Sequence, residues 1–267
     1  EVSKDLMLSK LSVLKDQFTE NYNPDIKVRV DRIKRLQLLV EENMDSFHKA
    51  LQSDFGSRHE QMSLLSDTLP VINNAKDALK NIHKWMKPEK RKPNFPLGLL
   101  GAKAYIQFQP YGVVGIISPW NFPLILSIAP LVEVLAAGNN AMMKLSEFVP
   151  ATSELTEELI SKYFNEKEVV VINGGPKTSQ EFSSLPFDHL LFTGSSNIGA
   201  KVMQSASKNL VPVTLELGGK SPVIIGRSAQ LDLAGTRLTF GKLLNGGQLC
   251  LSPDYVVVPN ELEEQLI

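Results

Sequence analysis

Cys250 is the only cysteine of the 267-residue chain, and its neighbours would leave its sulfur approachable. The segment Asn245–Cys250 contains two glycines, which also leave the local backbone N–H groups accessible. A nucleophilic thiolate needs such access together with a lowered thiol pKa. A lone cysteine is more often a buried, unreactive thiol, and this segment taken alone favours that structural alternative.

The histidines do not supply the base that cysteine hydrolases use. Those enzymes usually pair the thiol with an imidazole. Here His48, His59 and His83 lie in a region of helical pattern, and His189 opens a strand, away from its carboxyl end. The sequence also lacks the paired His or Cys spacing of metal sites. We therefore expect neither a Cys-His pair nor a metal ion.

Glu216 is a more suggestive partner for the cysteine. It stands in the apolar run Val213–Leu217, which two glycines and Lys220 follow. A carboxylate buried among apolar residues has a raised pKa, which suits it to act as a general base. The alternative is a structural carboxylate that pairs with Lys220 or with backbone N–H groups.

The segment Phe192–Gly199 is typical of phosphate binding at the start of a helix. A strand-like run enters Gly194, and Ser195 and Ser196 then precede a helical pattern. Small residues let a phosphate approach the free N–H groups of a helix N-terminus. The G-x-x-x-x-G spacing is neither the dinucleotide fingerprint nor a P-loop, so an ordinary helix cap by Ser195 or Ser196 is an equal alternative.

The elements that must position these residues change character near residue 100. Before it, apolar side chains recur at helical spacing, and Pro70 sits where a helix would kink or begin. The predicted helices there are Leu6–Phe18, a second from Pro24 to about Gln52, and Glu60–Trp85.

Beyond residue 100, short β-branched runs alternate with helical segments, after a hairpin-like strand at Tyr105–Gln109. This alternation predicts a parallel sheet with helices on its faces. Ligands bind at the carboxyl ends of such strands, where Asn121, Lys144, Gly194 and Glu216 are expected. The predicted strands are Gly112–Ile117, Asn140–Lys144, Val169–Ile172, His189–Thr193, Val213–Leu217 and Pro222–Ile225, and the predicted helices are Leu124–Ala137, Ala151–Phe164 and Ser195–Lys208.

Composition excludes several classes of protein. Hydrophobic residues make up 43% of the chain, enough for a packed core, and the net charge of −1 offers no basic excess for nucleic acid. One cysteine allows no internal disulfide, which favours a reducing, cytoplasmic location. Residues 104–143 carry one charged side chain, Glu133, but four prolines divide them into pieces too short for a membrane span.

Five segments resemble the NAD(P)-dependent aldehyde dehydrogenase superfamily, and together they extend the resemblance over essentially the whole chain. One alone is weak evidence, whereas all five in family order are very specific. The N-terminal region and Ser252–Tyr255 are most similar to the class 3 and coniferyl aldehyde dehydrogenase-like branch. The five segments are Pro119–Pro123 (PWNFP), Lys144–Glu147 (KLSE), Phe192–Gly199 (FTGSSNIG), Glu216–Lys220 (ELGGK) and Gly247–Cys250 (GQLC).

The resemblance implies a catalytic role for three residues. Cys250 would attack an aldehyde carbon, and the Asn121 amide and the Cys250 N–H would hold the resulting oxyanion. Hydride transfer would leave a thioester, and Glu216 would activate the water that hydrolyses it. The product would be a carboxylic acid.

The resemblance also implies how NAD(P) binds. Lys144 and Glu147 would contact the adenosine ribose, where the carboxylate repels a 2′-phosphate, so NAD is favoured and NADP is possible. Trp120 has core packing as its alternative. The remaining implied cofactor contacts are Gly194, Ser195 and Gly199 near the pyrophosphate and Trp120 and Leu217 beside the nicotinamide.

The implied fold is α/β, with a helical N-terminal region. A Rossmann-like NAD-binding domain would cover 1–217, with a hairpin arm around 92–110, and the first part of a second α/β domain, the catalytic domain, would cover 218–267. Family members continue past Ile267 into a Glu-x-Phe-Gly-Pro motif and a segment used in dimer contacts. We therefore expect a homodimer at full length and an inactive 1–267 fragment. Leu145 replaces a usual proline, and Leu249 a usual Thr or Cys.

Two alternatives stay open beside aldehyde oxidation. One is a CoA-acylating or acyl-phosphate-reducing relative, which keeps the thioester cysteine but has no use for the water-activating Glu216. The other is a non-catalytic protein on the same scaffold, against which the joint presence of Cys250, Glu216 and Asn121 argues.

Overall fold

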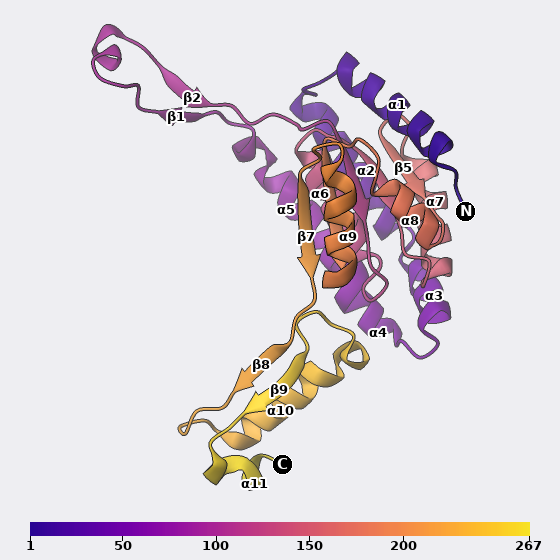
Figure 1. The fold of residues 1–267 in the computed structure, drawn as a ribbon, viewed down its shortest axis with the longest axis vertical. Helices are drawn as coiled ribbons and strands as arrows, with labels where there is room; N and C mark the ends of the chain where they lie inside the picture. The colour runs from indigo at the N-terminus through magenta and orange to yellow at the C-terminus, as the bar shows by residue number, and fades with distance from the viewer.

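A five-stranded parallel sheet organises the computed structural model, which describes all 267 residues (Figure 1). Its central strand pairs with a neighbour on each side, and the chain order reverses between β3 and β6. Such a reversal marks the place where open α/β sheets bind ligands. The predicted α/β class is confirmed. In sheet order the strands are β5 (Val169–Ile172), β4 (Asn140–Lys144), β3 (Val113–Ile117), β6 (His189–Gly194) and β7 (Val213–Leu217).

Helices cover both faces of this sheet because its strands are apolar on both sides. Val114 and Ile116 of β3 face a core of 26 buried residues, whereas Val113 and Ile117 face a second core of 16. The first core is covered by α2 (Ile26–Glu41), α3 (Met44–Phe55), α5 (Leu69–Trp85), α6 (Ile125–Ala136) and α7 (Pro150–Tyr163), and the second by α1 (Lys4–Glu20), α8 (Pro176–Phe182) and α9 (Ser196–Ser207).

Two predicted N-terminal helices are divided in the structure. The helix expected from Pro24 to about Gln52 ends at Glu41, because the Asn43 side chain donates to the Leu39 carbonyl at 2.8 Å and α3 then begins. The helix expected over Glu60–Trp85 consists of α4 (Glu60–Ser63), a π-helical turn at Leu64–Thr68 and α5. Pro70 lies in the first turn of α5, where its missing N–H is tolerated.

A hairpin arm projects from the body of the molecule (Figure 1). Strand β1 (Glu89–Arg91) pairs with β2 (Ala104–Ile106) in antiparallel fashion, so the predicted hairpin is confirmed, with a shorter strand than Tyr105–Gln109. The tip of the arm exposes large apolar side chains, including Phe95 and Leu99, which are 86% and 79% exposed.

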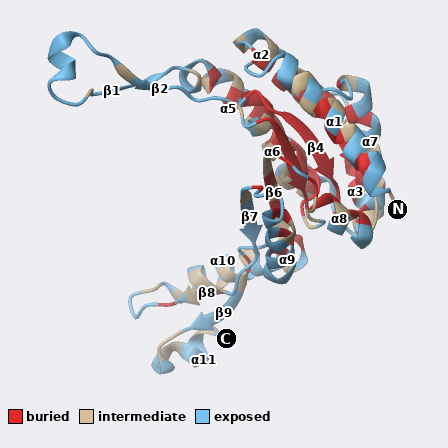
Figure 2. Cartoon of the chain, turned by 45° about the horizontal axis from the view of Figure 1, so that its top comes forward, coloured by how far each residue is buried: buried red, intermediate tan, exposed pale blue.

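A smaller unit projects from the opposite side of the body and continues directly from β7 (Figure 1). Figure 2 shows that it is mostly exposed, in contrast to the buried sheet. Strands β8 (Ser221–Ile224) and β9 (Pro253–Val257) pair in parallel, and the sequence-based prediction missed β9, α8 and the helices of this unit. Its helices are α10 (Leu231–Leu243) and α11 (Glu263–Leu266), and it has short 3₁₀ turns at Leu244–Gly247 and Asn260–Leu262. A further 3₁₀ turn, Leu97–Leu100, lies in the hairpin arm.

The apolar stretch at 104–143 divides into β2, β3, α6 and the start of β4, as its prolines predict. Every helix of the structure is too short or too polar to cross a bilayer.

Candidate active site

A cleft of about 940 Å³ opens at the carboxyl ends of β3 and β6, where the strand order reverses. Trp120, Glu147, Gly194 and Ser195 line it together, although they come from three different connections of the sheet. Its volume is within the usual range for a ligand site. Of the residues expected at the strand ends, Gly194 and Ser195 line this cleft, whereas Asn121, Lys144 and Glu216 lie outside its lining.

The start of α9 forms part of the cleft wall. Ser195 caps this helix, because its Oγ accepts a hydrogen bond from the Ile198 N–H at 3.4 Å. The capping alternative is thus seen in the structure, but the same residue also lines the cleft. The remaining free N–H groups of this helix end and its positive dipole favour an anionic group.

Gly199 and Leu217 lie outside the cleft lining and contact each other instead. A Cβ atom on Gly199 would lie 2.8 Å from Leu217 Cδ2, so the glycine lets α9 pack closely on β7. This packing is a sufficient reason for a glycine at position 199.

Lys144 and Glu147 form a pair beside the cleft. Lys144 is 1% exposed, and its Nζ donates to Glu147 Oε2 at 3.2 Å and to the Leu145 carbonyl. Burial lowers the pKa of Lys144, and the Glu147 carboxylate partly opposes this change. Glu147 is exposed at the cleft, so it can accept hydrogen bonds from hydroxyl groups of a ligand.

Asn121 contacts the cysteine-bearing segment across 127 residues of sequence. Its Nδ2 donates to the Gln248 carbonyl at 3.0 Å, and Asn245 Nδ2 donates back to the Asn121 carbonyl at 2.9 Å. The cysteine segment can turn toward Asn121 because Asn245, Gly246 and Gly247 all have positive φ. Asn245 is a site residue that the sequence-based prediction missed.

Cys250 has an exposed, free thiol in this segment. The structure therefore contradicts the buried-thiol alternative and agrees with the approachable sulfur that the neighbouring glycines predict. Gln248, whose carbonyl accepts from Asn121, stands two residues before Cys250, so the amide contacts the segment that carries the thiol.

Glu216 lies on β7 opposite Thr193 of β6, near the carboxyl edge of the sheet, but it is exposed. The expectation that it is buried among apolar residues is wrong, because β7 is an edge strand with one exposed face. Lys220, one partner named in the structural alternative, pairs instead with Asp254, at 2.7 Å from its Nζ.

Two helix faces complete the cleft and were not predicted. Ser179 and Gln180 come from α8, and Lys201 and Lys208 from α9 or its end. Their spacing, together with Ile198, Val202 and Ser205, follows the three- and four-residue period of a helix face. That period could have identified them, had the cleft side of each helix been known. The two lysines add positive charge to this wall of the cleft.

The histidines lie away from the cleft. His189, at the amino end of β6, stacks on Tyr111 and contacts Thr214 Oγ1 at 2.9 Å, and burial lowers its pKa. Ligand atoms of Asp45, His48 and Glu60 lie within 4.8 Å of one another, a grouping that the sequence spacing did not indicate. His48 Nδ1 lies 3.5 Å from a carboxylate oxygen of Glu60.

Comparisons with known proteins agree with this arrangement. The aldehyde dehydrogenase family model matches residues 14–267. The probable coniferyl aldehyde dehydrogenase of Caulobacter vibrioides is 51% identical over 91% of this chain and 50% of that protein. The coniferyl aldehyde dehydrogenase of a Pseudomonas species is 44% identical over 95% of this chain and 52% of that protein. The chain thus spans about half the length of the curated relatives it matches.

Solved structures of aldehyde dehydrogenases are also similar to this chain. The substrate-bound AldH of Staphylococcus aureus aligns with a TM-score of 0.93 and 36% identity over 97% of this chain and 56% of that one. A Mycobacterium tuberculosis aldehyde dehydrogenase in complex with NAD+ aligns with a TM-score of 0.83 and 26% identity over 96% of this chain and 52% of that one. With its cleft at the strand reversal and its amide beside an exposed cysteine, the chain belongs to the aldehyde dehydrogenase family.

Proposed function

We propose that this chain supplies the nucleotide cleft and the nucleophile of an enzyme that oxidises an aldehyde to a carboxylic acid with NAD. The observation that carries the proposal is the Asn121–Gln248 hydrogen bond, which places a side-chain amide beside the segment of the exposed Cys250. Family membership supports the reaction class, since the similar proteins of Caulobacter and Pseudomonas are named as coniferyl aldehyde dehydrogenases.

The chemistry assigned to these residues is acyl transfer through sulfur. The Cys250 thiolate forms a bond to the aldehyde carbon, and the carbonyl oxygen becomes an oxyanion. Asn121 Nδ2 and the Cys250 N–H donate to that oxyanion. Departure of a hydride converts the thiohemiacetal to a thioester, and Glu216 takes a proton from the water that releases the acid.

The cleft fits a dinucleotide. Its wall offers a helix N-terminus and small residues at Gly194 and Ser195 for a pyrophosphate, a carboxylate at Glu147 for ribose hydroxyls, and Trp120 toward Asn121. Bound NAD supplies the acceptor for the hydride. The Glu147 carboxylate repels a 2′-phosphate, which favours NAD over NADP, and a related Mycobacterium enzyme is described in complex with NAD+.

An aromatic aldehyde is the proposed substrate class. The support is similarity to coniferyl aldehyde dehydrogenases at 44–51% identity, which bears on substrate only by analogy. A homodimer is the proposed assembly. The exposed apolar tip of the β1–β2 arm supports it, because soluble proteins rarely expose a contiguous apolar patch without a partner.

The proposed function is tested by NADH formation with a panel of aromatic and aliphatic aldehydes. The assay uses a protein as long as the curated relatives, in which residues 1–267 form the N-terminal part. Aldehyde-dependent NADH formation and release of the acid are expected. Bound NAD with no NADH from any aldehyde would favour a non-catalytic protein, and turnover that needs coenzyme A or phosphate would favour the acylating alternative.

A further inference from the structure

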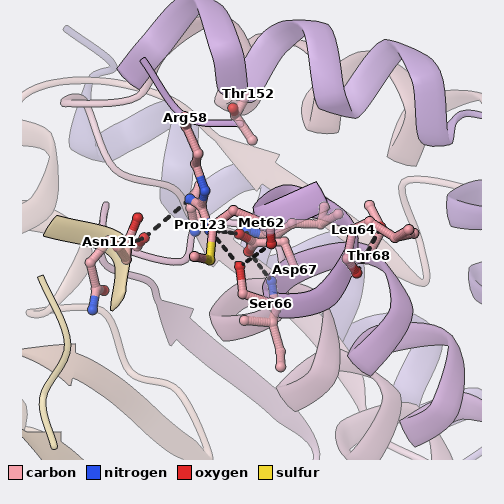
Figure 3. Close-up of polar contacts among 12 residues, drawn as sticks. Arg58, Met62, Leu64, Ser66, Asp67, Thr68, Asn121, Pro123 and Thr152 are labelled. Carbon is pink, nitrogen blue, oxygen red and sulfur yellow. Dashed lines mark hydrogen bonds and ion pairs between the residues drawn. The ribbon is translucent and has the colours of Figure 1, made fainter. Parts of the chain in front are cut away.

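A buried ion pair outside the cleft contacts the segment that carries Asn121. The side chains of Arg58 and Asp67 are 2% and 0% exposed, and Arg58 Nη2 lies 2.5 Å from Asp67 Oδ2. Arg58 precedes α4, and Asp67 lies in the π-helical turn that follows it. Figure 3 shows the guanidinium of Arg58 between that turn and Asn121.

Arg58 holds the segment at two points. Its Nη1 donates to the backbone carbonyl of Asn121 at 3.3 Å, and its guanidinium carbon lies 5.2 Å from the ring centroid of Phe122. The same carbonyl accepts a second hydrogen bond from Asn245. Because two donors share one carbonyl oxygen, the Asn121 peptide is held at that atom while its side-chain amide donates to the Gln248 carbonyl.

Asp67 holds the end of the same segment. Its Oδ1 accepts hydrogen bonds from the N–H groups of Leu124 at 3.1 Å and Ile125 at 3.0 Å. These are free N–H groups at the amino end of α6, and the residue before this helix does not cap it with its own side chain. Asp67 therefore acts as a distant cap, and its charge also matches the helix dipole.

Stability alone is a weak reason for this pair. Burial raises the pKa of Asp67 and lowers that of Arg58, so the protein interior disfavours both charges, and only their attraction and the hydrogen bonds offset this. Apolar residues of similar volume often replace a buried ion pair with no loss of stability. The contacts with residues 121–125 give these two charges a more specific role.

We propose that Arg58 and Asp67 are positioning residues, which fix the Asn121 peptide so that its amide faces the cysteine segment. The inference rests on the proposed function, because it needs Asn121 to donate to the oxyanion. Neither Arg58 nor Asp67 lines the cleft, so both act through Asn121. The N-terminal helical layer thereby becomes part of the catalytic apparatus.

Variants of similar size that lack the charge test this role against a matched control. Asp67→Asn and Arg58→Met should slow the first turnover of NADH by roughly 10- to 100-fold, because small misplacement of a catalytic group has effects of that size. NAD affinity should be unchanged. Glu168→Gln is the control, since Glu168 also accepts hydrogen bonds from two arginines, Arg32 and Arg35, but lies before the edge strand β5. It should keep the wild-type first-turnover rate.

A double-mutant cycle separates positioning from general stability. In an Asn121→Ala background, Arg58→Met should lower the rate by less than about twofold, because the group it positions is already gone. Arg58→Lys keeps a cation and should recover part of the rate. An Arg58→Met effect that persists at full size without the Asn121 amide would overturn the proposal.

A double variant without either charge tests the proposal if the single variants fail to fold. Arg58→Met combined with Asp67→Leu removes both charges and should restore the melting temperature without restoring the rate. Amide hydrogen exchange over residues 118–125 should be faster in this variant. Full activity with unchanged exchange would contradict the positioning role. An inactive wild type would contradict the proposed function instead, and the exchange measurement would still test whether the pair orders the segment.

Discussion

Residues 1–217 and 218–267 build the two sides of the candidate site in different ways. The first region contains nearly every buried side chain, and its sheet and helices shape the nucleotide cleft directly. The second buries only Ile225, Asn245 and Ser252. Its cysteine segment is located by polar contacts with Asn121. The cleft therefore depends on apolar packing, whereas the position of the segment that carries Cys250 depends on a few directional hydrogen bonds.

Cys250→Ala should have the largest effect, because it removes the nucleophile from the second region without touching the first. Aldehyde oxidation should fall by more than about 10³-fold, while NAD binding stays unchanged. Turnover by NADH absorbance and NAD affinity by calorimetry check this. Retained turnover with lost NAD binding would reverse the roles assigned to the two regions.

Asn121→Ala removes the side chain that joins the two regions. The first-turnover rate should fall by about 10²- to 10³-fold, as for the loss of an oxyanion donor. The KM for NAD should change little, since this side chain points to Gln248. A rapid-quench measurement of the first turnover checks the rate, and Asn245→Ala tests whether the reciprocal hydrogen bond has a smaller effect of the same kind.

Glu216→Gln should slow hydrolysis of the thioester by about 10²-fold, because the general base is lost while shape is kept. Hydride transfer precedes that step, so a pre-steady-state burst of NADH should appear. Slow turnover without a burst would mean that another group is the base. The test matters because Glu216 is exposed, and not buried as expected.

Glu147→Gln should change the preference between NAD and NADP without slowing the chemical steps, since Glu147 lines the cleft of the first region. Loss of the negative charge should raise the kcat/KM ratio of NADP to NAD by roughly tenfold, or ~1.4 kcal/mol. Steady-state assays with both nucleotides check this. An unchanged ratio would contradict a role of the Glu147 carboxylate in nucleotide choice.

The smallest expected effect concerns acid stability of the packed region. Burial alone would raise the pKa of Glu168, but hydrogen bonds and charges of Arg35 and Arg32 hold it below its ordinary value of 4.5. Its contribution to the unfolding free energy is therefore fully present above that value and lost as pH falls through the lower, folded-state pKa. Glu168→Gln should flatten the decline of melting temperature in this acidic range. An identical decline in the variant would assign it to other carboxylates.

Local sequence was sufficient for the strands but not for the helix boundaries near the site. Short apolar runs identify all five strands of the main sheet, and β3, β4 and β5 are buried along their whole length. The break at Asn43 and the π-helical turn before Leu69 depend on particular hydrogen bonds and were missed. Glu216 was expected to be buried, since an apolar run does not reveal whether its strand lies at a sheet edge.

The sequence by itself determined the α/β class and the strand ends at which the cleft lies, because periodicity and residue type act locally. It indicated Cys250 as a candidate nucleophile only through the resemblance of five segments to a known family. Only the tertiary structure decided which hydrogen bonds join Asn121 to the cysteine segment and that Arg58 and Asp67 contact residues 121–125. Those contacts join residues far apart in the chain. Their hydrogen bonds depend on distance and angle, which residue type alone does not specify.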